Sequence, residues 1–119
     1  MSSLTTLARP YAKAAFELAQ GEQALARWEE MLSLAGSIVV EKSMANLLRS
    51  PEVSSALAVN IITEAAGEAF DGRFRDFLSV LAGNDRLPLL PQIMVLYRRL
   101  REEAEKRLSV KVVSAIPLD

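Results

Sequence analysis

The beginning of the chain has apolar positions at the three- and four-residue spacing of an α-helix. Placed at steps of about 100°, residues 4–20 contain one stripe made of Leu4, Leu7, Tyr11, Ala14 and Leu18. Four alanines at positions 8, 12, 15 and 19 form a second stripe beside it. Together the two stripes cover roughly 200° of the helix, against the ~100° that a surface helix turns toward its core. One stripe is enough to dock the helix, so the other must face a second layer of the domain or a partner.

Pro10 lies in the middle of this pattern. A proline removes one backbone donor and clashes with the carbonyl four residues back, yet it is favoured at the start of a helix. Because the stripe already includes Leu4 and Leu7, we expect one long helix kinked near Pro10. The alternative is a helix that begins only at Pro10.

Five further amphipathic patterns follow, over residues 24–38, 41–49, 53–66, 73–83 and 90–108. They predict an all-α fold, a compact bundle of six helices. Ser50 is expected to cap the fourth helix, with Pro51 in its first turn. The fifth helix carries a stripe of Phe70, Phe74, Phe77 and Leu81 with Leu78 beside it, and Val80 lies apart on the flank that also holds Arg73 and Asn84.

The period changes after the sixth helix. Residues 109–116 alternate and are rich in β-branched side chains, which indicates a strand. No second strand is predicted to pair with it, and a lone strand does not stand by itself. We therefore divide the chain into a helical domain over residues 1–108 and the start of a truncated second domain over residues 109–119, expected to be disordered or bound by a neighbour.

Composition narrows the class of partner. The 119 residues are half hydrophobic and carry a net charge of −1, with basic and acidic residues mixed along the chain. This is enough for one core, and it offers no basic field for nucleic acid or anionic lipid. No apolar run reaches the length of a membrane span, and the first residues resemble neither a signal nor a transit peptide. The lack of cysteine excludes a disulfide framework. We expect a cytosolic compartment.

Candidate chemistry is sparse. The sequence has no histidine and no cysteine, and its paired carboxylates, such as Glu29 with Glu30, are adjacent in helices and point about 100° apart. Its five glycines form no phosphate loop. We therefore expect no catalytic, metal or cofactor site. Trp28 is expected in the core with its ring nitrogen on a local acceptor, and the mixed charges of residues 98–107 are typical of a solvated face with weak ion pairs.

Three segments in order resemble the delta subunit of F-type ATP synthase, whose mitochondrial counterpart is the oligomycin-sensitivity-conferring protein. They are Ala8-Arg9-Pro10-Tyr11-Ala12-Lys13-Ala14-Ala15-Phe16, then Asn84-Asp85-Arg86-Leu87 with Leu90-Pro91, and finally Val113-Ser114-Ala115-Ile116-Pro117-Leu118. The resemblance covers the whole chain and, with no transit peptide, suggests a bacterial form.

The resemblance implies a six-helix N-terminal domain and a non-catalytic role in the peripheral stalk, the stator that stops the catalytic head from rotating. In that family this domain binds the amphipathic N-terminal helix of an alpha subunit in a groove between the first and fifth helices. The missing C-terminal domain would bind the b subunits. The implied location is the cytoplasmic face of the bacterial inner membrane, without direct insertion.

Carried over to this chain, the groove would have Leu7, Tyr11, Ala14 and Leu18 on one wall. The other wall would have Phe77, Val80, Leu81 and Asn84. Trp28 would lie close to the bound helix without anchoring it.

The residues alone leave an alternative open, a helical adaptor that binds an unrelated amphipathic helix or self-associates through the same stripe. A small enzyme would need a convergent polar pocket that the sequence does not contain. The stator hypothesis expects a monomer when the partner is absent.

Overall fold

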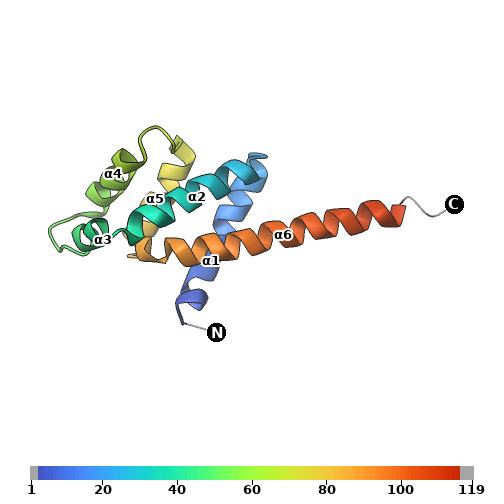
Figure 1. The fold of residues 1–119 in the computed structure, drawn as a ribbon, viewed down its shortest axis with the longest axis horizontal. Helices are drawn as coiled ribbons and strands as arrows, with labels where there is room; N and C mark the ends of the chain where they lie inside the picture. The colour runs from blue at the N-terminus through green and yellow to red at the C-terminus, as the bar shows by residue number, and fades with distance from the viewer. Residues whose placement is uncertain (1–2, 116–119) are drawn as a thin grey trace.

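The computed structural model describes the backbone of residues 3–115 and the side chains of residues 3–107. Within this range all regular structure is helical, which confirms the predicted class (Figure 1). The elements in chain order are α1 (Ser3–Gly21), α2 (Leu25–Val40), α3 (Lys42–Leu48), α4 (Ser55–Ala66), α5 (Gly72–Gly83), the single 3-10 turn η1 (Leu87–Leu89) and α6 (Leu90–Ala115). Pro10 lies inside α1, so the helix does not begin there.

The helices pack around α2, α6 and the short turn η1. Helix α1 lies along α6, α2 contacts α1, α3, α4 and α6, and α4 packs against α5. The turn η1 sits among them and contacts α1, α2, α5 and α6. The buried residues of α6 are Leu90, Ile93, Leu96 and Tyr97. Beyond them α6 leaves the bundle as a projecting rod, which Figure 1 shows in orange and red.

An aromatic cluster from α2 and α5 forms the centre of the core. The Trp28 ring meets Phe74 and Phe77 edge-on, with centroids 5.3 and 5.7 Å apart, and Phe70 tilts against Phe74 at 4.7 Å. All four rings are buried. The indole Nε1 of Trp28 donates to Glu22 Oε1 at 3.4 Å. The predicted core position of Trp28 and its local acceptor are both confirmed, and edge-to-face pairs add to the gain from area burial.

Two short polar side chains mark helix starts, and one of them corrects the sequence analysis. Asp71 Oδ1 accepts from the amide of Phe74 at 2.9 Å, which caps α5. Helix α4 begins later than predicted, because Ser54 rather than Ser50 is its cap and accepts from the Leu57 amide at 3.1 Å. The Ser50 hydroxyl instead accepts from the amide of Glu52, two residues on, which stabilises a turn that competes with helix formation.

The strand predicted over residues 109–116 is wrong for residues 109–115, where α6 continues as a helix. Residue 116 lies outside the described range. A helix pairs its backbone N–H and C=O groups within one segment, whereas a strand needs a neighbour to pair with. No strand is present among the described residues to act as that neighbour. The β-branched composition of the segment is therefore a local preference that does not produce a strand by itself.

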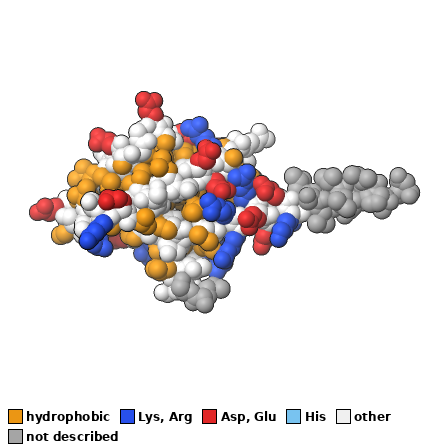
Figure 2. Space-filling view, viewed as in Figure 1, with side chains coloured by type: hydrophobic (Ala, Val, Ile, Leu, Met, Phe, Trp, Pro, Cys, Tyr) orange, Lys and Arg blue, Asp and Glu red, His pale blue; other side chains and the backbone are white. Residues whose placement is uncertain are grey.

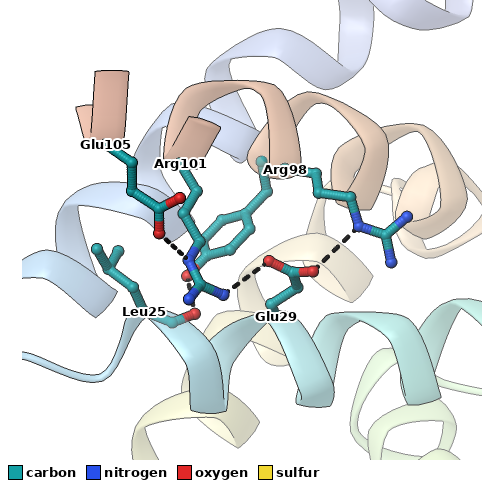
Figure 3. A network of polar contacts seen from close by, with 6 residues as sticks. Leu25, Glu29, Arg98, Arg101 and Glu105 are labelled. Carbon is teal, nitrogen blue, oxygen red and sulfur yellow. Dashed lines mark hydrogen bonds and ion pairs between the residues drawn. The ribbon is translucent and has the colours of Figure 1, made fainter. Parts of the chain in front are cut away.

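Ion pairs join α2 to α6 at the point where α6 leaves the bundle (Figure 3). Glu29 of α2 accepts from Arg98 Nε and from Arg101 Nη1, each at 3.0 Å. Arg101 also pairs with Glu105 at 3.1 Å, and Arg107 pairs with Glu103 at 3.4 Å, both four residues apart. The weak pairs expected along the charged part of α6 are thus present, and Glu29 adds a connection across two helices.

None of the described helices is by itself long and apolar enough to cross a membrane. Helices α2 and α3 pass on length and composition only when joined across their 83° bend, which is weak support because a buried core helix passes the same test.

Candidate partner-binding site

The two apolar stripes of α1 have different surroundings. Ala8, Ala12, Ala15 and Ala19 have no exposed surface. The other stripe faces outward: Leu7 is 42% exposed, and Tyr11, Ala14 and Leu18 are half-buried. One stripe docks the helix and the second is left over, as the hydrophobic pattern predicts. We call Leu4, Leu7, Tyr11, Ala14 and Leu18 the outer stripe of α1.

The four predicted residues of the opposite wall separate into two pairs. Phe77 and Leu81 are buried in the core of α5, and Phe77 contacts Trp28. Val80 is 54% exposed, and Asn84, just after the helix, is also exposed. The aromatic stripe of α5 is therefore core. Of the four residues, Val80 and Asn84 are exposed to a partner, whereas Phe77 and Leu81 pack in the core.

Two connections link α1 and α5 indirectly, one through the turn after α1 and one through η1. Where α1 ends, Glu22 pairs with Arg73 at the start of α5, at 3.3 Å. Just beyond the end of α5, η1 contacts both α5 and α1. The Trp28 ring packs against Phe74 of α5, and its indole N–H donates to the same Glu22. Glu22 thus links the end of α1, the start of α5 and the only tryptophan of the chain.

Polar chemistry is concentrated elsewhere, at the junction of α2 and α6. Figure 2 shows charged side chains gathered over α6, while hydrophobic ones are visible toward the end that carries α3 and α4. The Tyr97 hydroxyl donates to the carbonyl of Leu25 at 2.6 Å. Burial raises the pKa of this hydroxyl well above its usual value; Arg101 opposes the shift and Glu29 adds to it. The group stays protonated and acts as a structural donor.

The part of the chain with described side chains contains no group of three or more His, Cys, Asp or Glu residues placed to hold a metal ion. A hollow of about 360 Å³ lies between α3, α4 and η1 and is lined largely by apolar side chains such as Leu48, Val53 and Leu87. Sequence reasoning missed it, because it arises where α3, which has no buried residue, covers its neighbours incompletely. No local sequence signal marks such a gap.

Comparison with known proteins adds a second line of information. Residues 7–119 match the family described as ATP synthase delta (OSCP) subunit. The chain is 43% identical over 119 residues to the ATP synthase subunit delta of Alcanivorax borkumensis, covering all of this chain and 67% of that protein. Similar proteins of the same name from Thioalkalivibrio sulfidiphilus and Idiomarina loihiensis are each 42% identical over 118 residues, covering 99% of this chain and 66% of theirs. The chain thus spans about two thirds of the length of these relatives.

Proposed function

The chain belongs to the ATP synthase delta (OSCP) subunit family, a family of structural, non-catalytic subunits, and from this premise we propose a specific task for it. The helical bundle is a stator element of a bacterial ATP synthase that binds the amphipathic N-terminal helix of an alpha subunit. The binding region is the outer stripe of α1 together with Val80 and Asn84 beside α5. By holding the catalytic head, the bundle resists its rotation with the central shaft.

The observation that carries this proposal is the outer stripe. Five apolar side chains at spacings of three and four remain exposed or half-exposed on a helix whose alanine stripe is already buried. Anchors at this spacing fit an amphipathic helix laid into an apolar groove. Burial of the stripe releases water from apolar surface at about 25 cal/mol per Å², an upper limit that the cost of association reduces.

The two walls differ in what they contribute. Helix α1 supplies large side chains that a partner contacts directly, with Tyr11 and Leu7 as the main anchors. Helix α5 supplies Val80 and Asn84 at its edge, while Phe77 and Leu81 fix the position of that edge through the core. The Glu22–Arg73 pair links the turn after α1 to the start of α5. In this proposal the two helices already belong to one folded bundle before the partner binds, which lowers the ordering cost of binding.

The remaining partners belong to the same proposal. The third of the relatives' length that this chain does not span would contact the b subunits. The subunit would work at the cytoplasmic face of the inner membrane, attached through other subunits.

Calorimetric titration with a synthetic peptide of the alpha subunit's N-terminal segment tests the proposal. Trp28 fluorescence provides a second readout, because its ring packs against Phe77 of α5. We expect saturable one-to-one binding and a monomer without peptide. Tyr11→Ala and Leu7→Ala should each weaken binding by about 1 kcal/mol or more, as loss of a central anchor does.

Leu57→Ala is the matched control, because Leu57 is 44% exposed on α4, nearly the same as Leu7 on α1. It should leave the dissociation constant unchanged within about twofold. Absence of binding by both calorimetry and fluorescence would remove the proposed function. Mass that rises with concentration, and falls on Tyr11→Ala, would instead favour self-association through the outer stripe.

A further inference from the structure

The line where α1 meets α6 carries a second open surface. A hollow of about 450 Å³ lies there, with an apolar floor of Ala12, Leu96 and Leu100. Three cations border it, Arg9 and Lys13 from α1 and Arg99 from α6. A smaller hollow of about 200 Å³ shares Leu96 and Arg99 with the first and continues toward the start of α6, past Val95, which is 45% exposed. We call these joined hollows the α1–α6 seam.

The lining of the seam contains more cations than carboxylates, because Arg9, Lys13 and Arg99 face a single acidic residue, Glu103. Arg98 and Arg101 pair with Glu29, whereas Lys13 and Arg99 form no ion pair with any described residue. Glu103 is the one carboxylate lining the larger hollow, and it pairs with Arg107. Two cations of the seam are therefore available to a partner. Apolar floor between them makes the surface amphipathic.

The seam is separate from the outer stripe. With about 100° per residue, Arg9 lies roughly 160° around α1 from Tyr11, and the buried alanines lie between them. A helix bound on the outer stripe does not cover the seam. Both surfaces of α1 can be occupied at once.

We infer that the seam binds an acidic segment of a subunit of the catalytic head, an inference that rests on the proposed stator function. Carboxylates of that segment pair with Lys13 and Arg99, and an apolar side chain enters the floor between Leu96 and Leu100. A protein segment fits better than a single phosphate, because the cations border an elongated apolar surface and do not converge on one point. Charge pairing at such an exposed rim mainly speeds association and sets orientation.

Zero-length carbodiimide coupling in the assembled ATP synthase tests the contact directly, since it joins a lysine amine only to a carboxylate that touches it. We expect Lys13 to be linked to an Asp or Glu of a subunit of the catalytic head, as identified by peptide mass spectrometry. Lys13→Arg retains the charge and should abolish that link without releasing the subunit. Lys42, exposed on α3, is the reference lysine and should not form it. Links from Lys13 confined to carboxylates of its own chain would overturn the inference.

Binding of the full-length subunit to the purified catalytic head provides the second test. Lys13→Glu with Arg99→Glu should weaken binding about tenfold at low salt, and the difference should shrink as salt screens the charges. Lys42→Glu with Arg49→Glu on α3 makes the same charge change away from the seam and should have no comparable effect.

The alpha-subunit peptide separates the two proposals. The Lys13→Glu, Arg99→Glu variant should bind that peptide as the wild type does, which also shows that it is folded. Unchanged head binding by this variant at every salt concentration would overturn the seam and leave the stator function intact. Failure of the wild type to bind the peptide or the head would overturn the stator function itself.

Discussion

Along α1 the side chains without exposed surface are four alanines, whereas along α5 they are Phe74, Leu78 and Leu81. Small side chains let the backbone of α1 approach its neighbours closely, and its larger groups, Leu7 and Tyr11 among them, remain at the surface. Helix α5 does the reverse and turns its large groups inward, with Val80 left outside. Both helices have surplus apolar positions in sequence, but only α1 keeps a row of them for a partner.

This difference predicts that shortening a buried side chain destabilises the protein more in α5 than in α1. Phe74→Ala removes a ring that packs against Trp28, Phe70 and Phe77 and leaves a cavity in a fully buried position. The free energy of unfolding should fall by about 3–5 kcal/mol. Urea denaturation followed by circular dichroism measures it. Val80→Ala, on the exposed side of the same helix, should cost less than about 1 kcal/mol. Equal losses for the two variants would contradict the division of α5 into a core face and an open edge.

Enlarging a buried side chain should destabilise the protein more in α1 than in α5. Ala15 has no exposed surface, so Ala15→Leu forces three extra carbon atoms into a filled contact and should cost about 1–3 kcal/mol. Ala14→Leu makes the same change one residue earlier, on the half-buried outer stripe, and should cost clearly less. Thermal unfolding of both variants gives the comparison. If Ala14→Leu proved the more harmful, the outer stripe would be packed against the chain itself and would not be open to a partner.

The contrast between the helices was only partly predictable from sequence. The two stripes of α1 follow from helical periodicity, which is a local property, and the sequence predicts both of them. The same periodicity shows Phe74 and Val80 on different flanks of α5, but it cannot tell which flank meets Trp28, 46 and 52 residues away in sequence. An aromatic stripe at helical spacing favours the core, and Phe77 and Leu81 are buried as that pattern predicts; their place on the groove wall came only from the family resemblance.

The features that the sequence did not predict depend on distant residues. The Glu29 pairs with Arg98 and Arg101 span 69 and 72 residues, and the α1–α6 seam needs Lys13 beside Arg99. The prediction of a strand after residue 108 was wrong because it relied on a local preference alone. The β-branched residues there express that preference, and no described strand is present to pair with the segment. Local patterns therefore identified the helices and the outer stripe, while the hollows and cross-helix pairs required the fold.

Tyr97 offers the finest test of how α1 is held, since its ring meets Phe16 of α1 edge-on at 6.0 Å while its hydroxyl donates to Leu25 of α2. Tyr97→Phe keeps the ring and removes one hydrogen bond, which should lower the free energy of unfolding by about 1 kcal/mol at neutral pH. A clearly larger loss would mean that the hydroxyl stabilises the contact between α2 and α6 by more than one ordinary hydrogen bond.

The pH dependence of that loss follows from the raised pKa of the Tyr97 hydroxyl. Above a pH of about 10 the unfolded chain releases this proton while the folded chain keeps it, so the folded state binds more protons and its stability falls as pH rises. The contribution of Tyr97 is complete below pH ~10 and should decline by up to about 1.4 kcal/mol per pH unit above it.

Urea unfolding of the wild type and Tyr97→Phe between pH 8 and pH 11 should therefore give stability curves that converge, and then cross, because only the wild type carries this group. All other titrating groups are common to both proteins and cancel in the difference. A constant gap between the two curves would show that the Tyr97 hydroxyl titrates alike in the folded and unfolded chains, which would contradict the raised pKa in the folded state.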